Sequence, residues 1–178
     1  MKKLLTTLAI LALFAAPGFA QSMAGGYVNL DSPAAVNPGD TGVEFKFYVY
    51  NGSVDTEWTA DVIFTFPTCF TVTGGYYDDG GLGWVFIFNA AGNVASFNDG
   101  DAGYGEIYDG DAGYFYVTVD VGAGCPAGPA SVHWFQQGDI WGADPHFVEG
   151  DVDFTIGGTA TGESTWSSVV RMRPASCS

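Results

Sequence analysis

The residues best suited to chemistry lie in an aspartate- and glycine-rich stretch, N-D-G-D-A-G-Y-G-E-I-Y-D-G-D-A-G, at 98–113. The motif D-G-D-A-G-Y occurs twice here, at 99–104 and at 109–114. Calcium takes six to eight oxygen ligands from carboxylates, backbone carbonyls and water, and glycine lets the backbone bend to offer them. The pattern predicts a calcium site whose candidate ligands are Asp99, Asp101, Glu106, Asp109 and Asp111.

A second acidic loop runs from 138 to 146, and in it Asp139 and Asp144 are further candidate calcium ligands. Neither loop has the spacing of an EF-hand, D-x-[DN]-x-[DN]-G followed by a distant Glu. Neither matches the glycine-rich repeat of calcium-binding β-rolls. The alternative interpretation is that Asp and Gly occur in these loops for their backbone preferences, as residues of solvated turns.

Aromatic residues in loops indicate a different ligand. Tyr76, Tyr77 and Trp141 are candidates for a platform on which the apolar face of a sugar stacks, as in β-sandwich carbohydrate-binding modules. Aromatic residues make up 16% of the chain, so most of them must pack in its core. Trp141 is the best exception because it lies in the glycine-rich loop at 138–146.

Enzymatic activity has little support, because the chain contains only two histidines. Nucleophilic catalysis needs a base to activate the nucleophile, and that base is usually histidine. We interpret His133 as a strand-face residue and His146 as a hydrogen-bonding residue of a loop. Carboxylate pairs arise by chance among 20 acidic residues and do not by themselves indicate a glycosidase. We therefore predict a protein that is not an enzyme.

The first 20 residues have the features of a secretory signal peptide. Lys2 and Lys3 precede an apolar run at 4–16 that is too short to span a membrane, and small residues follow. We predict cleavage after Ala20 and a secreted location, extracellular or at the cell surface, with the periplasm as an alternative. No later apolar stretch is long enough to cross a bilayer, so no membrane insertion is expected after signal removal.

The remaining chain is strongly acidic. Removing Lys2 and Lys3 with the signal peptide changes the formal net charge from −15 to −17, and leaves Lys46, Arg171 and Arg173 as the cationic residues. Such a surface repels phosphate backbones and anionic lipid headgroups, so nucleic acid and membrane surfaces are not expected as partners. The acidity serves either solubility outside the cell or the clustered binding of cations.

The chain has three cysteines, which an exported protein can oxidise. Cys69 follows a predicted strand that ends at Phe66, and Cys125 follows one that ends at Val121, so we predict a Cys69–Cys125 disulfide. Cys177 is then left over. It is either an idle thiol or a link to another chain.

Two predicted strands, at 43–50 and 58–66, organise the chain because each shows the period of two that is typical of strands with one buried face. The turn residues Asn51-Gly52-Ser53 between them predict a hairpin, and Pro67 ends the second strand. Side chains sharing one face are Val43, Phe45, Phe47 and Val49 in the first strand, and Trp58, Ala60, Val62, Phe64 and Phe66 in the second.

Further strands are predicted at short intervals, and no long segment has the helical period. With 26 glycines, this pattern predicts an all-β sandwich of about eight or nine strands over residues 21–157. The tail at 158–178 is a last edge strand, a flexible end, or a segment that pairs with another molecule. The further strands are 26–30 at an edge, 70–73, 84–88 covered on both faces, 94–97, 114–121, 131–136 and 147–156, with a loop at 74–81.

The turn N-P-G-D-T, the strand V-E-F-K-F-Y-V-Y-N and the following E-W-T-A-D-V-I-F-T-F-P resemble immunoglobulin-like modules of bacterial secreted and cell-surface proteins. The cell-adhesion-related group, abbreviated CARDB, and similar repeat domains are the families in question. The resemblance covers residues 26–67, and 114–156 only as generic strand patterning. It implies an immunoglobulin-like, mostly antiparallel β-sandwich that is extracellular and non-catalytic, with an adhesive or structural role. It carries no site residues onto this chain.

Together these observations predict a structural or adhesive extracellular protein that is stabilised by calcium and self-associates or binds cell-surface proteins. The alternative is a carbohydrate-binding module that uses exposed aromatic residues.

Overall fold

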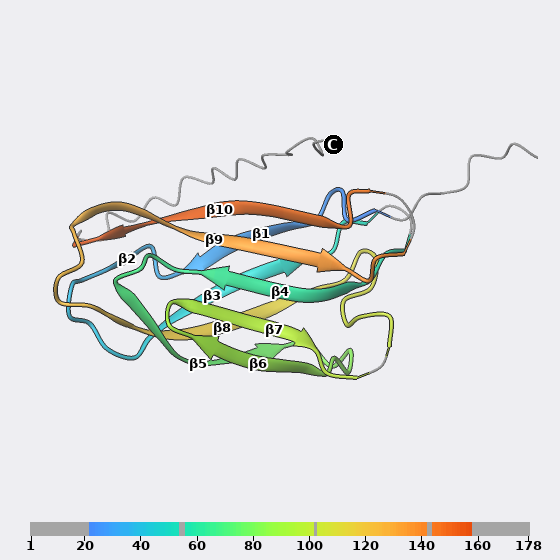
Figure 1. Ribbon diagram of the computed structural model, residues 1–178, viewed down its shortest axis with the longest axis horizontal. Coiled ribbons are helices and arrows are strands. Elements are labelled where there is room, and N and C mark those ends of the chain that lie inside the picture. The colour runs from blue at the N-terminus through green and yellow to red at the C-terminus, as the bar shows by residue number, and fades with distance from the viewer. Residues whose placement is uncertain (1–21, 54–55, 102, 142–143, 158–178) are drawn as a thin grey trace, which may run out of the picture.

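The computed structural model describes residues 22–53, 56–101, 103–141 and 144–157. These residues form two β-sheets packed face to face, so the predicted all-β sandwich is confirmed (Figure 1). The described residues contain ten strands, against the prediction of about eight or nine. Among the described residues, no helix is long and apolar enough to cross a membrane. The predicted signal peptide at 1–20 and tail at 158–178 lie outside the described residues.

The first sheet has four strands in the order β1-β3-β8-β5, and the second has six in the order β2-β10-β9-β4-β7-β6. All neighbouring strands are antiparallel except β2, which runs parallel to β10. The strands are β1 Tyr27–Ser32, β2 Ala35–Val36, β3 Val43–Tyr50, β4 Thr59–Thr65, β5 Phe70–Asp78, β6 Phe86–Ala91, β7 Val94–Asp99, β8 Ala112–Val121, β9 Gly128–Gly138 and β10 Phe147–Ile156.

The two strands that organise the chain do not form the predicted hairpin. β3 pairs with β1 and β8 in the four-stranded sheet, whereas β4 pairs with β9 and β7 in the other sheet. The connection between them therefore crosses from one layer to the other. The buried Asn51 side chain holds the start of this connection, because its Nδ2 donates to the carbonyls of Glu57 and Ile107, each at 2.8 Å. Period-two patterning located both strands, but it carried no information about their partners.

A β-bulge changes which side chains of β4 face inward. The pairing of β4 with β9 passes from Thr59 directly to Asp61, so Ala60 is an extra residue and the alternation shifts by one. Trp58 and Ala60 are consequently only half-buried, while Glu57 and Thr59 are buried in their place. The prediction that Trp58 and Ala60 face the core is wrong for this reason.

Two neighbouring segments also differ from expectation. β5 continues through most of the predicted loop at 74–81 because it pairs with β8 as far as Asp78. At the edge strand β6, Phe86 is buried while Ile87 and the preceding Val85 are exposed, so the expected cover on both faces is wrong. The segment is apolar throughout because the side chains on its exposed face are apolar as well as those on its buried face.

The other predicted strands are confirmed. β1 lies at an edge of the four-stranded sheet, β6 and β7 form a hairpin, and β8 carries buried residues at every second position. β9 and β10 are the longest antiparallel pair; β10 has its predicted bounds, and β9 extends slightly beyond the predicted 131–136.

Aromatic rings from both sheets fill the core. Phe47 of β3 stacks on Phe64 of β4 with 4.1 Å between ring centroids. Phe115 of β8 meets Phe97 of β7 edge-on, with 4.9 Å between centroids. Because each pair joins strands of opposite sheets, these contacts hold the two layers together.

The predicted disulfide between Cys69 and Cys125 is present, with 5.5 Å between the Cα atoms. It joins the turn before β5 to the turn after β8, so it links the start of β5 to the adjacent end of its neighbour β8. Cys177 lies outside the described residues.

Candidate functional site

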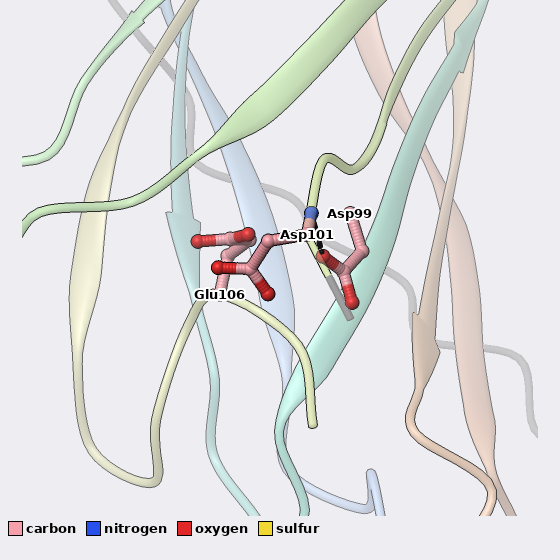
Figure 2. A group of neighbouring side chains, drawn as sticks. All are labelled: Asp99, Asp101 and Glu106. Carbon is pink, nitrogen blue, oxygen red and sulfur yellow. Dashed lines mark hydrogen bonds between the residues drawn. The ribbon is translucent and has the colours of Figure 1, made fainter. Parts of the chain in front are cut away.

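Three acidic side chains converge beside the end of β7. Asp99 is the last residue of β7, and Asp101 and Glu106 lie in the segment that leads towards β8. One carboxylate oxygen from each residue lies within 4.8 Å of those of the other two. Figure 2 shows the three carboxylates directed towards one another. We call this group the acidic triad.

Backbone hydrogen bonds hold the acidic triad in place. Asp99 Oδ1 accepts from the Asp101 N–H at 2.9 Å, and Asp101 Oδ1 accepts from the Gly103 N–H at 2.7 Å. Glu106 is fixed to the sandwich itself, because its N–H donates to the Thr59 carbonyl at 2.8 Å, next to an isolated bridge between Thr59 and Ile107. The loop is therefore anchored on β4 at the bulge.

Glu106 is the buried member of the triad, with 8% of its surface exposed. Its Oε2 accepts a hydrogen bond from the Val85 N–H at 2.6 Å, whereas its buried Oε1 has no partner among the described residues. Burial is the largest cause that raises the pKa of Glu106; the Val85 N–H opposes the rise, and Asp99 and Asp101 add to it. A buried carboxylate oxygen without a partner is costly, and a cation at this place would remove the cost.

The donor set suits a hard cation. Carboxylate oxygens are the preferred ligands of Ca²⁺, which also accepts backbone carbonyls and water in a flexible geometry. The triad has no histidine or cysteine, so the softer ligands of zinc and copper sites are missing from it. Asp99 and Asp101 are more exposed than Glu106, which leaves one side of the triad open to solvent.

The second copy of the D-G-D-A-G-Y motif lies elsewhere. Asp111 and Gly110 belong to a tight turn that is hydrogen-bonded to the backbone of Asn51: the Gly110 N–H donates to the Asn51 carbonyl, and the Asn51 N–H donates to the Asp111 carbonyl. Among the described residues, neither Asp109 nor Asp111 joins the acidic triad. This turn leads directly into β8.

The other two acidic candidates also lie apart from the triad. Asp139 Oδ1 accepts from the Trp141 N–H at 3.0 Å, which is the local turn expected of an aspartate. Asp144 is highly exposed, and its Oδ1 lies 3.6 Å from Nε2 of His146. In the described part of the chain these two aspartates do not gather with a third ligand.

A buried carboxylate that sequence analysis missed lies at the start of β4. Glu57 is fully buried; its Oε1 lies 3.1 Å from His146 Nδ1, and its Oε2 has no partner among the described residues. The interpretation of His146 as a hydrogen-bonding loop residue agrees with this contact. Sequence analysis missed Glu57 because regular alternation along β4, continued back through Thr59, places its side chain on the solvent-facing side of the strand.

The three aromatic candidates lie in different surroundings. Tyr77 faces inward, where its hydroxyl donates to the Trp84 carbonyl at 2.7 Å and its ring contacts Phe86 and Phe115. Tyr76 lies on the outer face of the four-stranded sheet and is 50% exposed. Trp141 is exposed in the loop between β9 and β10. These residues therefore do not form one platform.

Comparison with known proteins finds no matching family model and no matching curated protein. Several solved structures share the architecture. The major pilin subunit BcpA of Bacillus cereus has 9% identity and a TM-score of 0.50, over 74% of this chain and 40% of that chain. The likeness shows the fold.

Two further solved structures are similar at a lower score. A non-cellulosomal cohesin from the archaeon Archaeoglobus fulgidus has 14% identity and a TM-score of 0.48, over 75% of this chain and 91% of that chain. AvmM, described as catalysing macrocyclization in alchivemycin A biosynthesis, has 16% identity and a TM-score of 0.49, over 82% of this chain and 94% of that chain. A shared fold does not determine function, so function must be argued from residues.

Proposed function

We propose that this protein is a non-catalytic, extracellular β-sandwich with a structural or adhesive role, stabilised by calcium bound at Asp99, Asp101 and Glu106. The observation that carries the proposal is the buried Glu106, whose Oε1 has no partner among the described residues and whose carboxylate lies beside two further carboxylates. A bound Ca²⁺ would supply the missing partner and cancel the repulsion between three acidic groups.

Calcium at this place would join parts of the chain that are remote in sequence. Glu106 is bonded to β4 through Thr59 and to the start of β6 through Val85, while Asp99 ends β7. A ligand that binds only the folded state stabilises it, by about 2.7 kcal/mol when the ligand concentration is 100 times its dissociation constant. Extracellular calcium modules bind in the range of about 0.1 to 1 mM, which suits an exported protein.

Three features support the extracellular, non-catalytic part of the proposal. The Cys69–Cys125 disulfide suits an oxidising compartment. The chain is strongly acidic. Both histidines face carboxylates rather than a nucleophile: His133 lies 3.2 Å from Asp151, and His146 lies 3.1 Å from Glu57.

Self-association is supported by the edge of the six-stranded sheet. β6 is an edge strand, so one row of its backbone N–H and C=O groups lacks a strand partner in the described chain. The exposed Val85, which directly precedes β6, lies next to the acidic triad because its N–H donates to Glu106, and the exposed Ile87 lies in β6 itself. Calcium bound there would lower the repulsion between two acidic chains that meet at this edge.

The test is calorimetric titration of the chelator-treated protein with CaCl₂, together with thermal unfolding and light scattering. We expect binding heat and a rise in Tm of roughly 5–10 °C at saturation. Glu106→Gln should abolish both, because it keeps an acceptor for the Val85 N–H but removes the charge.

The matched control is Asp109→Asn with Asp111→Asn, which alters the second copy of the motif and should leave calcium binding intact. If wild-type protein gives neither heat nor a gain in Tm, the calcium site is wrong. If it stays monomeric at every protein and calcium concentration, self-association is excluded while the calcium site stands.

A further inference from the structure

A row of tyrosines crosses the outer face of the four-stranded sheet. Six of the nine tyrosines of the chain lie there, and every strand of the sheet contributes at least one. Five of them alternate with buried residues, and Tyr76 lies directly opposite Tyr116, so all six rings point away from the core. We call this surface the tyrosine face; its residues are Tyr27 of β1, Tyr48 and Tyr50 of β3, Tyr114 and Tyr116 of β8, and Tyr76 of β5.

The register of the strands brings these rings into one continuous series. Three pairs lie directly opposite one another on neighbouring strands, and further ring contacts link the pairs. With strands about 4.8 Å apart, the row extends about 14 Å across the sheet. The centroid distances are 5.0 Å for Tyr50–Tyr27, 6.2 Å for Tyr27–Tyr48, 5.5 Å for Tyr48–Tyr114, 6.5 Å for Tyr114–Tyr116 and 4.4 Å for Tyr116–Tyr76.

The tyrosine face combines apolar ring surface with available hydroxyl groups. The Tyr76 hydroxyl donates to Glu44 at 3.2 Å. The other five hydroxyls make no hydrogen bond to any described residue, so each can donate and accept towards a ligand. Tyrosine also loses little conformational entropy on binding, since few of its torsions must be fixed, and neighbouring rings already support one another here.

The charges on this face disfavour an anionic ligand. Among the described residues Lys46 is the one cation on this face, and its Nζ already lies 3.3 Å from Asp31 Oδ2 and 3.7 Å from the centre of the Tyr114 ring. Glu44 and Asp120 project from the same face, which is therefore slightly acidic on an acidic protein. Nucleic acids, acidic glycans and anionic lipids are repelled by such a surface.

We infer that the tyrosine face binds a neutral polysaccharide that lies across the strands. The apolar faces of sugar rings can pack on phenol rings, while sugar hydroxyls exchange hydrogen bonds with the phenol hydroxyls. A linear chain suits the extended row. Of the aromatic residues singled out from sequence, Tyr76 belongs to this surface, whereas Tyr77 and Trp141 do not.

A protein partner fits this face less well. Protein interfaces rely on a few anchors, chiefly Trp, Tyr and Arg, that fill well-packed pockets at the centre of the contact. Of these three types, the described part of the tyrosine face carries Tyr but neither Trp nor Arg. The exposed large aliphatic and Trp side chains of the described chain all lie outside the four-stranded sheet, and none of them is an anchor on the tyrosine face. They are Leu82, Val85, Ile87, Ile140 and Trp141.

The test uses the mature disulfide-bonded protein. Binding is measured to insoluble cellulose and chitin by depletion, to soluble neutral β-glucan and xylan by affinity electrophoresis, and to alginate as the anionic comparison, each with calcium and with chelator. We expect retention by at least one neutral polysaccharide and none by alginate. Tyr48→Ala with Tyr114→Ala should weaken that binding about tenfold or more, because it interrupts the middle of the row.

The matched control is Tyr104→Ala with Tyr108→Ala, which removes two exposed tyrosines that lie off this face and should leave binding unchanged. Should the Tyr48/Tyr114 variant fold poorly, nitration of wild-type tyrosines mapped by mass spectrometry replaces it. Bound glycan should then protect Tyr48 and Tyr114 but not Tyr104. The inference is overturned if no neutral polysaccharide binds, if alginate alone binds, or if a protein partner covers this face instead. It is also overturned if the Tyr48/Tyr114 substitutions leave binding unchanged and bound glycan does not protect Tyr48 and Tyr114 from nitration.

Discussion

Glu57 and His146 are separated by 89 residues in the sequence, yet Glu57 Oε1 lies 3.1 Å from His146 Nδ1. The contact ties the start of β4 to the loop before β10. Gly138 makes room for it, because a Cβ at that position would overlap the Glu57 carboxylate. A fully buried carboxylate thus joins two segments of the six-stranded sheet through a histidine.

This contact predicts a specific pH dependence for Glu57→Gln. Burial raises the pKa of Glu57 from 4.5, and His146 opposes that rise. A carboxyl group with a raised folded-state pKa holds its proton longer in the native state, so stability is lost as pH rises from 4.5 through the folded pKa. The free energy of unfolding of Glu57→Gln, relative to wild type, should therefore increase over that interval and level off above it.

Urea unfolding of both proteins from about pH 4 to about pH 8 measures this difference. The control is Glu149→Gln, which removes a carboxylate beside His133 at the surface. Its pH-dependent difference from wild type should be the smaller of the two. A Glu57→Gln difference that does not vary with pH would contradict the assignment of Glu57 as a buried, proton-retaining group.

The acidic triad predicts that calcium changes the pH dependence of stability. Burial raises the pKa of Glu106, so without calcium its ionisation also costs stability as pH rises through the folded pKa. Calcium binds the ionised form, so it should reduce that loss, bind more tightly as pH rises, and release protons on binding. Calorimetry in two buffers of different ionisation enthalpy measures the proton release, and identical heats in both buffers would count against the role of Glu106.

The disulfide predicts a large effect on stability. Cys69 and Cys125 are 56 residues apart in the sequence. Closing a loop of this length stabilises the folded state by about 4 kcal/mol in the chain-entropy model. The double variant Cys69→Ser with Cys125→Ser should have a free energy of unfolding lower by about this amount, as measured by guanidinium denaturation. Cys177→Ser is the control and should leave the value unchanged, while a non-reducing gel of the same variant reports whether Cys177 links two chains.

The stacked pair between the sheets predicts that Phe64→Ala costs about 3–5 kcal/mol. Phe64 is fully buried and stacks on Phe47 of the opposite sheet, so its removal leaves a cavity between the layers. The control is Ile63→Ala on the outer side of the same strand, where the side chain is only half-buried and the cost should be well below that range. Equal losses in the two variants would contradict the assignment of Phe64 to the inter-sheet core.

The two copies of D-G-D-A-G-Y show how far the candidate site was predictable. The composition of both copies predicted calcium ligands, and the first copy does contribute Asp99 and Asp101 to a converging group. The second copy, with Asp109 and Asp111, lies in a turn held by Asn51. The two copies of the same six residues differ in role because only the first copy is followed by a glutamate that is anchored on β4. That anchoring comes from a contact between residues remote in sequence.

Local alternation along the chain was enough to locate most strands and to place Tyr48 and Tyr114 on outward faces. This succeeded because the period of two depends only on neighbouring residues. The Cys69–Cys125 disulfide was predicted separately, from the position of each cysteine after a predicted strand. Sheet partners, the β4 bulge that buries Glu57, and the alignment of tyrosines across four strands depend on register between distant segments. Only the tertiary packing settles that register, since many pairings satisfy the same local pattern.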